Sequence, residues 1–402
     1  MYTMSSLIDQ LYSEQAWEEF LAYRLTKRRF KWHEFDEADL FIEDKAYQPM
    51  VEQILSNGVG IPHKQVINKM GANKKRIVYQ YDEETMTLLK LLAYQLYRYD
   101  DAFAPNCYAF RRGIHATDAV LKISNTVCNK HLWGYKVDIH NYFNSVDIPL
   151  LMSMLEELLR DDNTLLSFFR DMLMDDRAEY NGEIVHEARG VLAGVPTASF
   201  LANVYLMDMD HYFHEQGVIY ARYSDDIIIF AKDYDTLQTH RATILRFLAE
   251  RHLEVNPSKE HIYAPDEAFE FLGFECLNGH IDVSASGVEK MKGKIRRKTR
   301  ALLRWQKRKG APKERAMARL ITIFNHKFFD CSDNDSLTWS RWYFPIITEK
   351  KSLEEIDHYL QQCIRLFSTG RHTKANYRVS YDMLKELGYR SLVNEYYKSR
   401  GQ

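Results

Sequence analysis

The sequence VIYARYSDDIIIF occupies residues 218–230 and places two acids, Asp225 and Asp226, between two β-rich runs. Val218–Tyr223 and Ile227–Ala231 are dominated by β-branched and aromatic residues, which favour strands. The stretch therefore predicts a hairpin with both carboxylates at its tip. Like charges this close raise one pKa unless cations neutralise them, and magnesium prefers carboxylate oxygens. An ordinary solvated turn is the alternative for Ser-Asp-Asp taken alone.

A further acid favours the metal site over the turn. Asp138 lies 87 residues before Asp225, in the apolar run Gly134–Ile139, and is followed by Asn141-Tyr142-Phe143. One acid at the end of a strand and an acid pair in a hairpin form the ligand set of a two-metal site. Such sites stabilise the attacking and leaving oxygens of a phosphoryl displacement.

Composition excludes several classes of protein. Of the 402 residues, 46% are hydrophobic and 13% aromatic, as in a chain with a real core rather than a disordered one. The sequence contains no run of about eighteen apolar residues, so no membrane-spanning helix is predicted. Met1–Gln10 does not resemble a secretory signal. The five cysteines are scattered without a C-x-x-C pair, which argues against disulfides and zinc. We expect a reduced, cytoplasmic protein without membrane contact.

Predicted strands and helices alternate between about residues 75 and 285, which indicates an α+β core. Ser199–His214 reads as one helix, and Asn181-Gly182 and Asn278-Gly279 as hairpin turns. After Ser286 the strand signal ends, and four or five helical segments follow. Three regions are predicted: a helical region at 1–57, the α+β region at 58–285, and a helical region at 286–402.

A basic element opens the last region. Residues 290–319 contain fourteen Lys or Arg and one acid, although the net charge of the chain is −2. Such a bias is typical of a nucleic-acid contact, and a solvated helix face is the alternative.

Several motifs, taken in order, resemble those of reverse transcriptases. Val137-Asp138-Ile139-His140-Asn141-Tyr142-Phe143 resembles motif A of the palm, and Tyr223-Ser224-Asp225-Asp226 resembles motif C. The segment from Gly194-Val195-Pro196-Thr197 through Leu201-Ala202-Asn203-Val204-Tyr205-Leu206 resembles motif B. Leu253–Lys259 and Phe271–Phe274 resemble motifs D and E, and Lys75-Arg76 and Tyr108–Arg111 the finger motifs.

The resemblance implies a right-hand polymerase, with fingers and an antiparallel palm sheet in 58–285 and a basic thumb with an all-helical extension in 286–402. It implies an RNA-directed DNA polymerase that makes cDNA from an RNA template and dNTPs. Asp138, Asp225 and Asp226, with the backbone of Ile139, would bind two magnesium ions, manganese being the alternative metal.

The resemblance also assigns roles around the nucleotide. Phe143 matches the family's steric gate, an aromatic ring that clashes with a 2′-hydroxyl; a plain core aromatic is the alternative. Arg76 would grip the triphosphate, and Lys259 would face the leaving pyrophosphate, against the alternative of ordinary surface charges. Gly194 and Pro196 would shape the backbone beside template and nucleotide.

Nucleic-acid contacts are expected from the fingers and from the basic element. The candidates are Arg111, Lys290, Lys294, Arg297, Arg304 and Arg308. Aromatic residues between basic ones in the tail suit stacking on RNA bases or packing between helices. Tyr396 and Tyr397 are weak candidates for protein priming.

Motif B departs from the common family pattern. Ala193 stands where many members have glutamine, and Ala198-Ser199 where many have Ser-Pro. Retron signatures are not matched either, so the chain is most similar to the abortive-infection and defence-associated groups. We therefore expect a role in bacterial anti-phage defence, with a dedicated non-coding RNA as a candidate template. The sequence does not identify the template, the primer, the biological trigger or the oligomeric state.

Two other functions compete with this one. An untemplated or protein-primed DNA polymerase would keep the same palm. A catalytically silent RNA-binding scaffold is disfavoured, because Asp138, Asp225 and Asp226 are all present.

Overall fold

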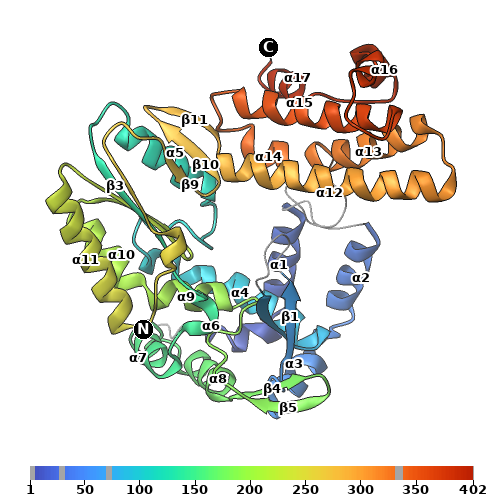
Figure 1. The fold of residues 1–402 in the computed structure, drawn as a ribbon. Helices are drawn as coiled ribbons and strands as arrows, with labels where there is room; N and C mark the ends of the chain where they lie inside the picture. Colours follow the sequence, from blue (N-terminus) through green and yellow to red (C-terminus); the bar gives the residue numbers. More distant parts are fainter. Residues whose placement is uncertain (1–4, 27–31, 69–74, 331–337, 402) are drawn as a thin grey trace. The chain divides into compact units, whose positions relative to one another are not determined.

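The computed structural model describes residues 5–26, 32–68, 75–330 and 338–401 (Figure 1). The chain divides into two compact units. The first unit comprises Met1–Ala119 and Leu132–Pro265, and the second Val120–His131 and Asp266–Gln402. The boundary predicted at 285–286 falls inside the second unit, and the assignment of functional regions to these ranges stays a prediction.

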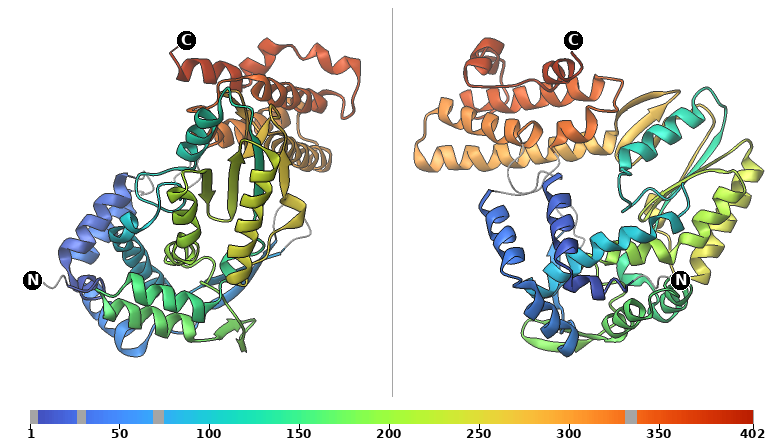
Figure 2. Two further views of the ribbon diagram at one scale, coloured as in Figure 1. Left: turned by 90° about the vertical axis from the view of Figure 1, so that its left-hand side faces the viewer. Right: turned by 180° about the vertical axis from the view of Figure 1, so that it is seen from behind.

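An antiparallel sheet forms the centre of the first unit, with strand order β6-β7-β3-β8. Its strands are β3 (Trp133–Asp138), β6 (Ile219–Tyr223), β7 (Asp226–Ala231) and β8 (His261–Tyr263). Residues 227–231 of β7 are all buried, which explains why this strand reads as a continuous apolar run. Helix α11 (Tyr234–Glu250) packs on β7 and β3, and α10 (Met207–Glu215) packs on β6 (Figure 2).

A second sheet of this unit has the order β2-β1-β4-β5. Strands β1 (His63–Asn68) and β2 (Lys75–Gln80) pair antiparallel, whereas β1 and β4 (Arg177–Tyr180) pair in parallel. Strands β4 and β5 (Glu183–His186) form the hairpin predicted at Asn181-Gly182, where both turn residues have positive φ.

The helices of the first unit surround these sheets and share one hydrophobic core with them. Besides α10 and α11, they are η1 (Asp9–Tyr12), α1 (Glu14–Thr26), α2 (Trp32–Glu43), α3 (Tyr47–Asn57), α4 (Glu83–Gln95), η2 (Leu96–Ala102), α6 (Tyr142–Ser145), α7 (Ile148–Leu158), α8 (Asn163–Met174) and α9 (Ala198–Tyr205). The short η3 (Pro257–Lys259) also belongs to this unit and is exposed. The single helix predicted over Ser199–His214 is wrong. Leu206 leaves helical geometry, with φ −118° and ψ 9°, and separates α9 from α10.

The second unit begins with a three-stranded antiparallel sheet and continues as helices. Strands β9 (Phe269–Phe271), β10 (Phe274–Leu277) and β11 (His280–Val283) form the sheet, with the predicted turn at Asn278-Gly279. The helices are α12 (Ala285–Lys309), α13 (Lys313–Phe328), α14 (Trp339–Tyr343), α15 (Lys351–Arg365), η4 (Leu366–Ser368), η5 (Lys374–Arg378), α16 (Tyr381–Glu386) and α17 (Leu392–Ser399). Helix α5 (Ala116–Val127) is divided between the two units.

Helix α12 carries the basic element. The side chain of Ser284 caps its first turn by accepting from the Gly287 amide at 3.2 Å, and Gly310 ends it in a left-handed conformation. One face is buried through Val288, Met291 and Ile295 and packs on α13 and α15, so the cations occupy the remaining surface.

Two predictions from composition can be compared with the described residues. Cys107, Cys128, Cys276 and Cys363 are free thiols, while Cys331 lies outside the described part of the chain. Within the same part, no helix combines the length and the apolar character that crossing a membrane requires.

Candidate active site

The register between β3 and β7 brings the predicted acids to one end of the sheet. Asp138, the last residue of β3, lies directly opposite Asp226, the first residue of β7. The Ile139 amide donates to the Asp225 carbonyl at 3.0 Å, which ties the end of β3 to the hairpin tip. The three carboxylates therefore come from adjacent backbone positions, although 87 residues separate Asp138 from Asp225.

The tip of the β6–β7 hairpin is held in an uncommon backbone conformation. Ser224 has a φ of 60°, in the left-handed region that non-glycine residues seldom adopt. Its carbonyl accepts from Nη1 of Arg222 at 3.2 Å. This bond fixes the turn immediately before Asp225, so the direction of the acid pair depends on a side chain two residues earlier.

Arg222 is itself part of a fully buried ion pair. Its Nε donates to Asp210 at 2.9 Å, and both side chains are completely shielded from solvent. The Tyr220 hydroxyl donates to the same carboxylate at 2.8 Å, and Asn203 accepts from Nη1 of Arg222 at 3.3 Å. A buried charge pair is tolerated when its remaining polar atoms are satisfied, as they are here. The network joins α9 and α10 to the β6–β7 hairpin.

Lysines neutralise two of the acids. Lys259 forms an ion pair with Asp138, and Nζ of Lys136 lies 3.8 Å from Asp226. The pKa of Asp226 is raised to about 6, chiefly by burial and also by Asp225 and Asp138, whereas Lys136 and Lys259 oppose the rise. Burial and the neighbouring acids together therefore outweigh the two lysines at Asp226.

Backbone contacts bring Lys259 to Asp138. The His140 amide donates to the Glu254 carbonyl at 2.7 Å, and the Asn256 amide donates to the Asp138 carbonyl at 2.8 Å. Lys259 follows in η3, where its amide donates to Asn256 at 2.9 Å. The segment that resembles motif D thus lies against the end of β3, and the role of Lys259 toward pyrophosphate stays a prediction.

The donor set suits a hard divalent cation, because it consists of carboxylate and backbone oxygens. The side chains are not arranged as a finished metal cage. Across residues 5–26, 32–68, 75–330 and 338–401, no three His, Cys, Asp or Glu side chains form a group that could hold a metal ion.

Phe143 lies next to these acids along the chain, in the short helix α6. Its ring is half-buried and contacts Tyr142 edge-on, with centroids 5.8 Å apart. The Val191 amide donates to the Phe143 carbonyl at 2.8 Å. A Cβ on Gly190 would lie 2.1 Å from that carbonyl oxygen, so only glycine permits this approach. The loop before motif B thereby fixes the backbone of Phe143.

The motif B glycine contacts the second sheet. Gly194 has a φ of 105°, and a Cβ there would lie 2.9 Å from the Tyr79 carbonyl oxygen. The Tyr79 amide donates to the Ala193 carbonyl at 2.7 Å, so Ala193 and Gly194 lie against β2, and Pro196 is half-buried two residues later. Arg76 belongs to the same strand and is exposed. Motif B and the predicted triphosphate ligand are therefore joined through one strand.

The residues predicted to contact nucleic acid differ in whether their charged groups are already hydrogen-bonded within the protein. The Arg111 guanidinium donates to the carbonyls of Ala104, Cys107 and Asp100 at 3.0, 3.2 and 3.1 Å, which is a bracing role. Its binding to nucleic acid stays a prediction.

On α12, Lys290, Arg297, Arg304 and Arg308 are exposed, and Lys294 is half-buried. Burial, together with Lys327, Arg297 and Lys290, lowers the pKa of Lys294. Cations that weaken one another's protonation form a surface that favours an anionic ligand.

Sequence reasoning missed the residues that support this site. Arg222 contacts the hairpin tip, Asp210 neutralises Arg222, and Gly190 contacts the Phe143 backbone, yet none is a conventional ligand. An arginine inside an apolar strand was a usable signal, because arginine is almost never buried unless it is paired.

Comparison with known proteins identifies relatives of this arrangement. The family described as "Reverse transcriptase (RNA-dependent DNA polymerase)" matches residues 66–276, more than half of the chain. A retron Ec48 reverse transcriptase from Escherichia coli is 29% identical over 136 residues. That match covers 32% of this chain and 30% of the relative, so the chain spans under a third of the relative's length in the match.

Solved structures of telomerase resemble the chain more distantly. Apo telomerase from Candida tropicalis, truncated from its C-terminal domain, has a TM-score of 0.46 at 13% identity, covering 56% of this chain and 55% of that one. Telomerase from Candida albicans in complex with a telomeric RNA fragment has a TM-score of 0.46 at 12% identity, covering 88% and 71%.

Proposed function

We propose that this chain, which belongs to the reverse transcriptase family, copies an RNA template into DNA. The observation that carries the proposal is the pairing of Asp138 with Asp226 beside the backbone contact of Asp225. Three carboxylates at one end of an antiparallel sheet suit nucleotidyl transfer, in which negative charge develops on phosphate oxygens. The substrates would be dNTPs and the product cDNA.

Asp138, Asp225 and Asp226, with the Ile139 backbone, would hold two divalent cations, magnesium or manganese. When bound, such ions stabilise the attacking and leaving oxygens of a phosphoryl displacement. Burial, followed by the charges of Asp225 and Asp138, raises the pKa of Asp226, and an incoming cation would favour its charged form, which supports this assignment.

Other residues of the chain would bind and orient the nucleotide. Arg76 would make paired hydrogen bonds to the triphosphate, since a guanidinium matches phosphate geometry. Lys259 would leave Asp138 and hold a proton for the departing pyrophosphate. Phe143 would lie under the sugar and reject a 2′-hydroxyl, while Gly194 and Pro196 would line the nucleotide's other side.

Primer extension tests the proposal. Wild type should extend a DNA primer on an RNA template with dNTPs and magnesium, and Asp138→Asn should abolish extension. Asp171→Asn replaces an exposed aspartate of α8 and serves as the matched control, with activity retained. Product without template would support the untemplated alternative. No product in any condition, with RNA binding intact, would support the silent scaffold.

The biological setting forms a further part of the proposal. We infer a role in anti-phage defence with a dedicated RNA template, based on the resemblance of the motifs to defence-associated enzymes. Phage plating on cells carrying wild type or Asp225→Asn tests the role, because only the active chain should lower plating efficiency. Sequencing the nucleic acid that copurifies with each would identify the template.

A further inference from the structure

Phe110 combines an exposed ring with an unfavourable backbone. Its φ is 58°, and its side chain is 37% exposed. The left-handed region suits glycine or asparagine, whereas a bulky residue adopts it only where the surroundings enforce it. The ring is too exposed for burial in the core to explain why phenylalanine stands at this position. The position of the ring therefore needs another reason.

The chain around Phe110 is fixed on both sides. The Tyr108 amide donates to the Arg222 carbonyl at 2.9 Å, and Nδ2 of Asn203 donates to the Ala109 carbonyl at 2.6 Å. Arg111 then bonds back to three carbonyls of the same loop. These contacts connect Phe110 to the buried network under the hairpin, so its ring has a defined place.

That place is beside the residue proposed as the steric gate. The Phe110 ring meets Phe143 edge-on, with centroids 6.1 Å apart and planes at 88°. It also contacts Tyr223, the residue before the hairpin tip, at 6.2 Å. Edge-to-face pairs are favourable beyond the area they bury, so the contact restricts how far the Phe143 ring can turn.

We infer that Phe110 is a specificity-determining residue, which braces Phe143 so that its ring keeps the position that excludes a 2′-hydroxyl. The inference rests on the proposed function, because discrimination has meaning only if the chain polymerises nucleotides. A gate ring free to rotate would admit ribonucleotides more readily, while the carboxylates would be unaffected. Phe110 would thus act on sugar selection rather than on the chemical step.

The test is the ratio of kcat/KM for dGTP to that for GTP on a poly(rC) template. Phe110→Leu should lower this ratio about three- to tenfold, the range that loss of one aromatic pair implies, with kcat for dGTP nearly unchanged. Phe110→Tyr keeps the ring and should restore the ratio. Phe110→Gly suits the backbone, so it should lose discrimination while keeping the wild-type Tm.

Tyr234→Leu is the matched control. Tyr234 is also an exposed aromatic, 45% accessible, and meets Trp133 edge-on at 5.0 Å, at the opposite end of β3 from Asp138. Its loss should leave the ratio unchanged. If Phe143→Val lowers the ratio but Phe110→Leu and Phe110→Gly both behave like wild type, the inference is wrong. If wild type incorporates no nucleotide, the proposed function itself fails.

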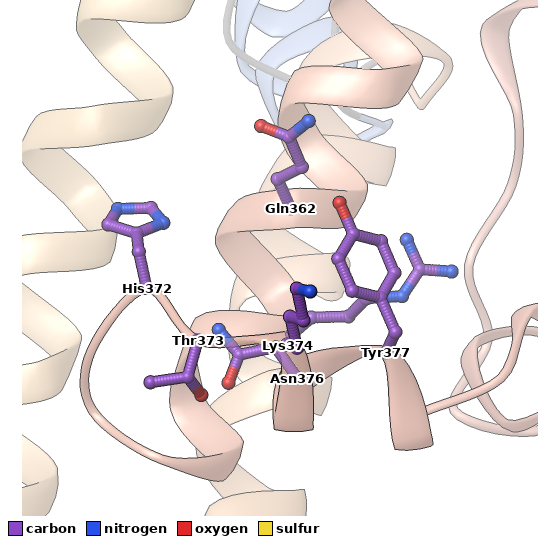
Figure 3. A pocket seen from close by; sticks show the side chains of 7 residues that line it. Gln362, His372, Thr373, Lys374, Asn376 and Tyr377 are labelled. Carbon is purple, nitrogen blue, oxygen red and sulfur yellow. The ribbon is translucent and has the colours of Figure 1, made fainter.

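A cavity in the second unit carries an independent inference. Its volume is about 290 Å³, and Figure 3 shows the ring of Tyr377 and the imidazole of His372 on either side of Lys374 and Asn376. The lining residues are Gln362, Arg365, His372, Thr373, Lys374, Asn376 and Tyr377. This set contains two permanent cations and no carboxylate, so the cavity favours an anion.

The cavity is held in shape by its own hydrogen bonds. Asn376, only 6% exposed, accepts from the Thr369 hydroxyl at 2.6 Å and donates to the Arg371 carbonyl at 3.0 Å. Nε of Arg365 donates to the Val379 carbonyl at 2.9 Å. Tyr377 is 68% exposed, with the Arg365 guanidinium 5.8 Å from its ring centre. An open aromatic face is thus held beside fixed positive charge.

We propose that this cavity binds a nucleotide, with the base on Tyr377 and the phosphate on Lys374. Aromatic faces stack on bases regardless of sequence, and nearby cations hold the phosphate. The nucleotide could come from an unpaired stretch of RNA or from free solution. Both sources share this chemistry, and competition distinguishes them.

Photo-crosslinking of the full chain to a decamer RNA carrying 5-bromouridine tests the cavity. Tryptic mapping should place a crosslink in residues 375–378, which contain Tyr377. Lys374→Gln removes one cleavage site, so its crosslink is read in the tryptic peptide 372–378, and the yield there should be severalfold lower than that of wild type. Lys385→Gln is the matched control, because Lys385 also lies over a tyrosine, Tyr381, at 4.7 Å, but is paired with Asp382 at 3.3 Å. Its yield should not change.

Excess unlabelled AMP or excess unlabelled RNA decamer separates the two sources. Loss of the crosslink with AMP would assign a free nucleotide, and loss with the decamer alone would assign an RNA strand. A crosslink map without residues 375–378, or equal yields in Lys374→Gln and wild type, would overturn the proposal.

Discussion

Replacing Asp226 with asparagine should stabilise the metal-free protein at neutral pH while abolishing DNA synthesis. Burial raises the pKa of Asp226 from 3.8 to about 6. The folded chain therefore binds this proton more tightly than the unfolded chain. By linkage, the free energy of unfolding falls as pH rises from about 4 to about 6, and the loss persists above that range. Asparagine carries no charge and escapes the loss.

The magnitude follows from the size of the pKa change. A difference of about two pKa units corresponds to about 3 kcal/mol. The Asp226 side chain is 26% exposed and faces Lys136, so solvent screening and the lost ion pair reduce the gain to about 1–2 kcal/mol. For a compact unit of this size, the Tm should rise by about 2–6 °C.

Thermal denaturation in EDTA at pH 7.5 and pH 4.5 measures the effect. Asp226→Asn should melt higher than wild type at pH 7.5, and the difference in Tm should be smaller at pH 4.5. Asp171→Asn, on an exposed face of α8, should stay close to wild type at both values. Equal Tm values at pH 7.5, or a larger gain at pH 4.5, would refute the reasoning. Magnesium should raise the Tm of wild type more than that of Asp226→Asn.

Three further changes have defined outcomes. Arg222→Met should lower the free energy of unfolding, measured by urea titration, by about 3–5 kcal/mol, because Asp210 is left as an unpaired buried charge. Adding Asp210→Leu should recover much of the lost free energy. Gly190→Ala should lower the Tm by several degrees, since its Cβ would meet a carbonyl oxygen at 2.1 Å; an unchanged Tm would contradict the packing. Lys294→Gln with Arg297→Gln should reduce the slope of log Kd against log salt by about 1.4 for single-stranded RNA, measured by anisotropy, and an unchanged slope would place the RNA elsewhere.

The sequence predicted the fold class because each signal there was local. The acid pair between two β-rich runs, the apolar run ending in Asp138 and the Asn-Gly turns all correspond to observed elements. The α+β fold with antiparallel sheets and a helical C-terminal region is confirmed, and the family match agrees with the right-hand polymerase. The break at Leu206 had no signal, because the residues on both sides favour helix.

The supporting residues could not be predicted in the same way. Arg222 and Asp210 are twelve residues apart on different elements, and only tertiary packing shows that each neutralises the other. Gly190 precedes a motif whose usual glycine is Gly194, so its contact with the Phe143 backbone depends on loop geometry. Whether the three carboxylates, Arg76, Phe143 and Lys259 act as assigned stays a prediction.

The strand order has a consequence for the timing of synthesis. Both partners of β3, namely β7 and β8, lie later in the chain, so β3 has no strand to pair with when it is made. Asp226 follows Asp138 by 88 residues. At about 5–20 residues per second, the interval is roughly 4–18 seconds. During that time the β3 segment has no partner strand in the growing chain, so chaperones or other chains can bind it.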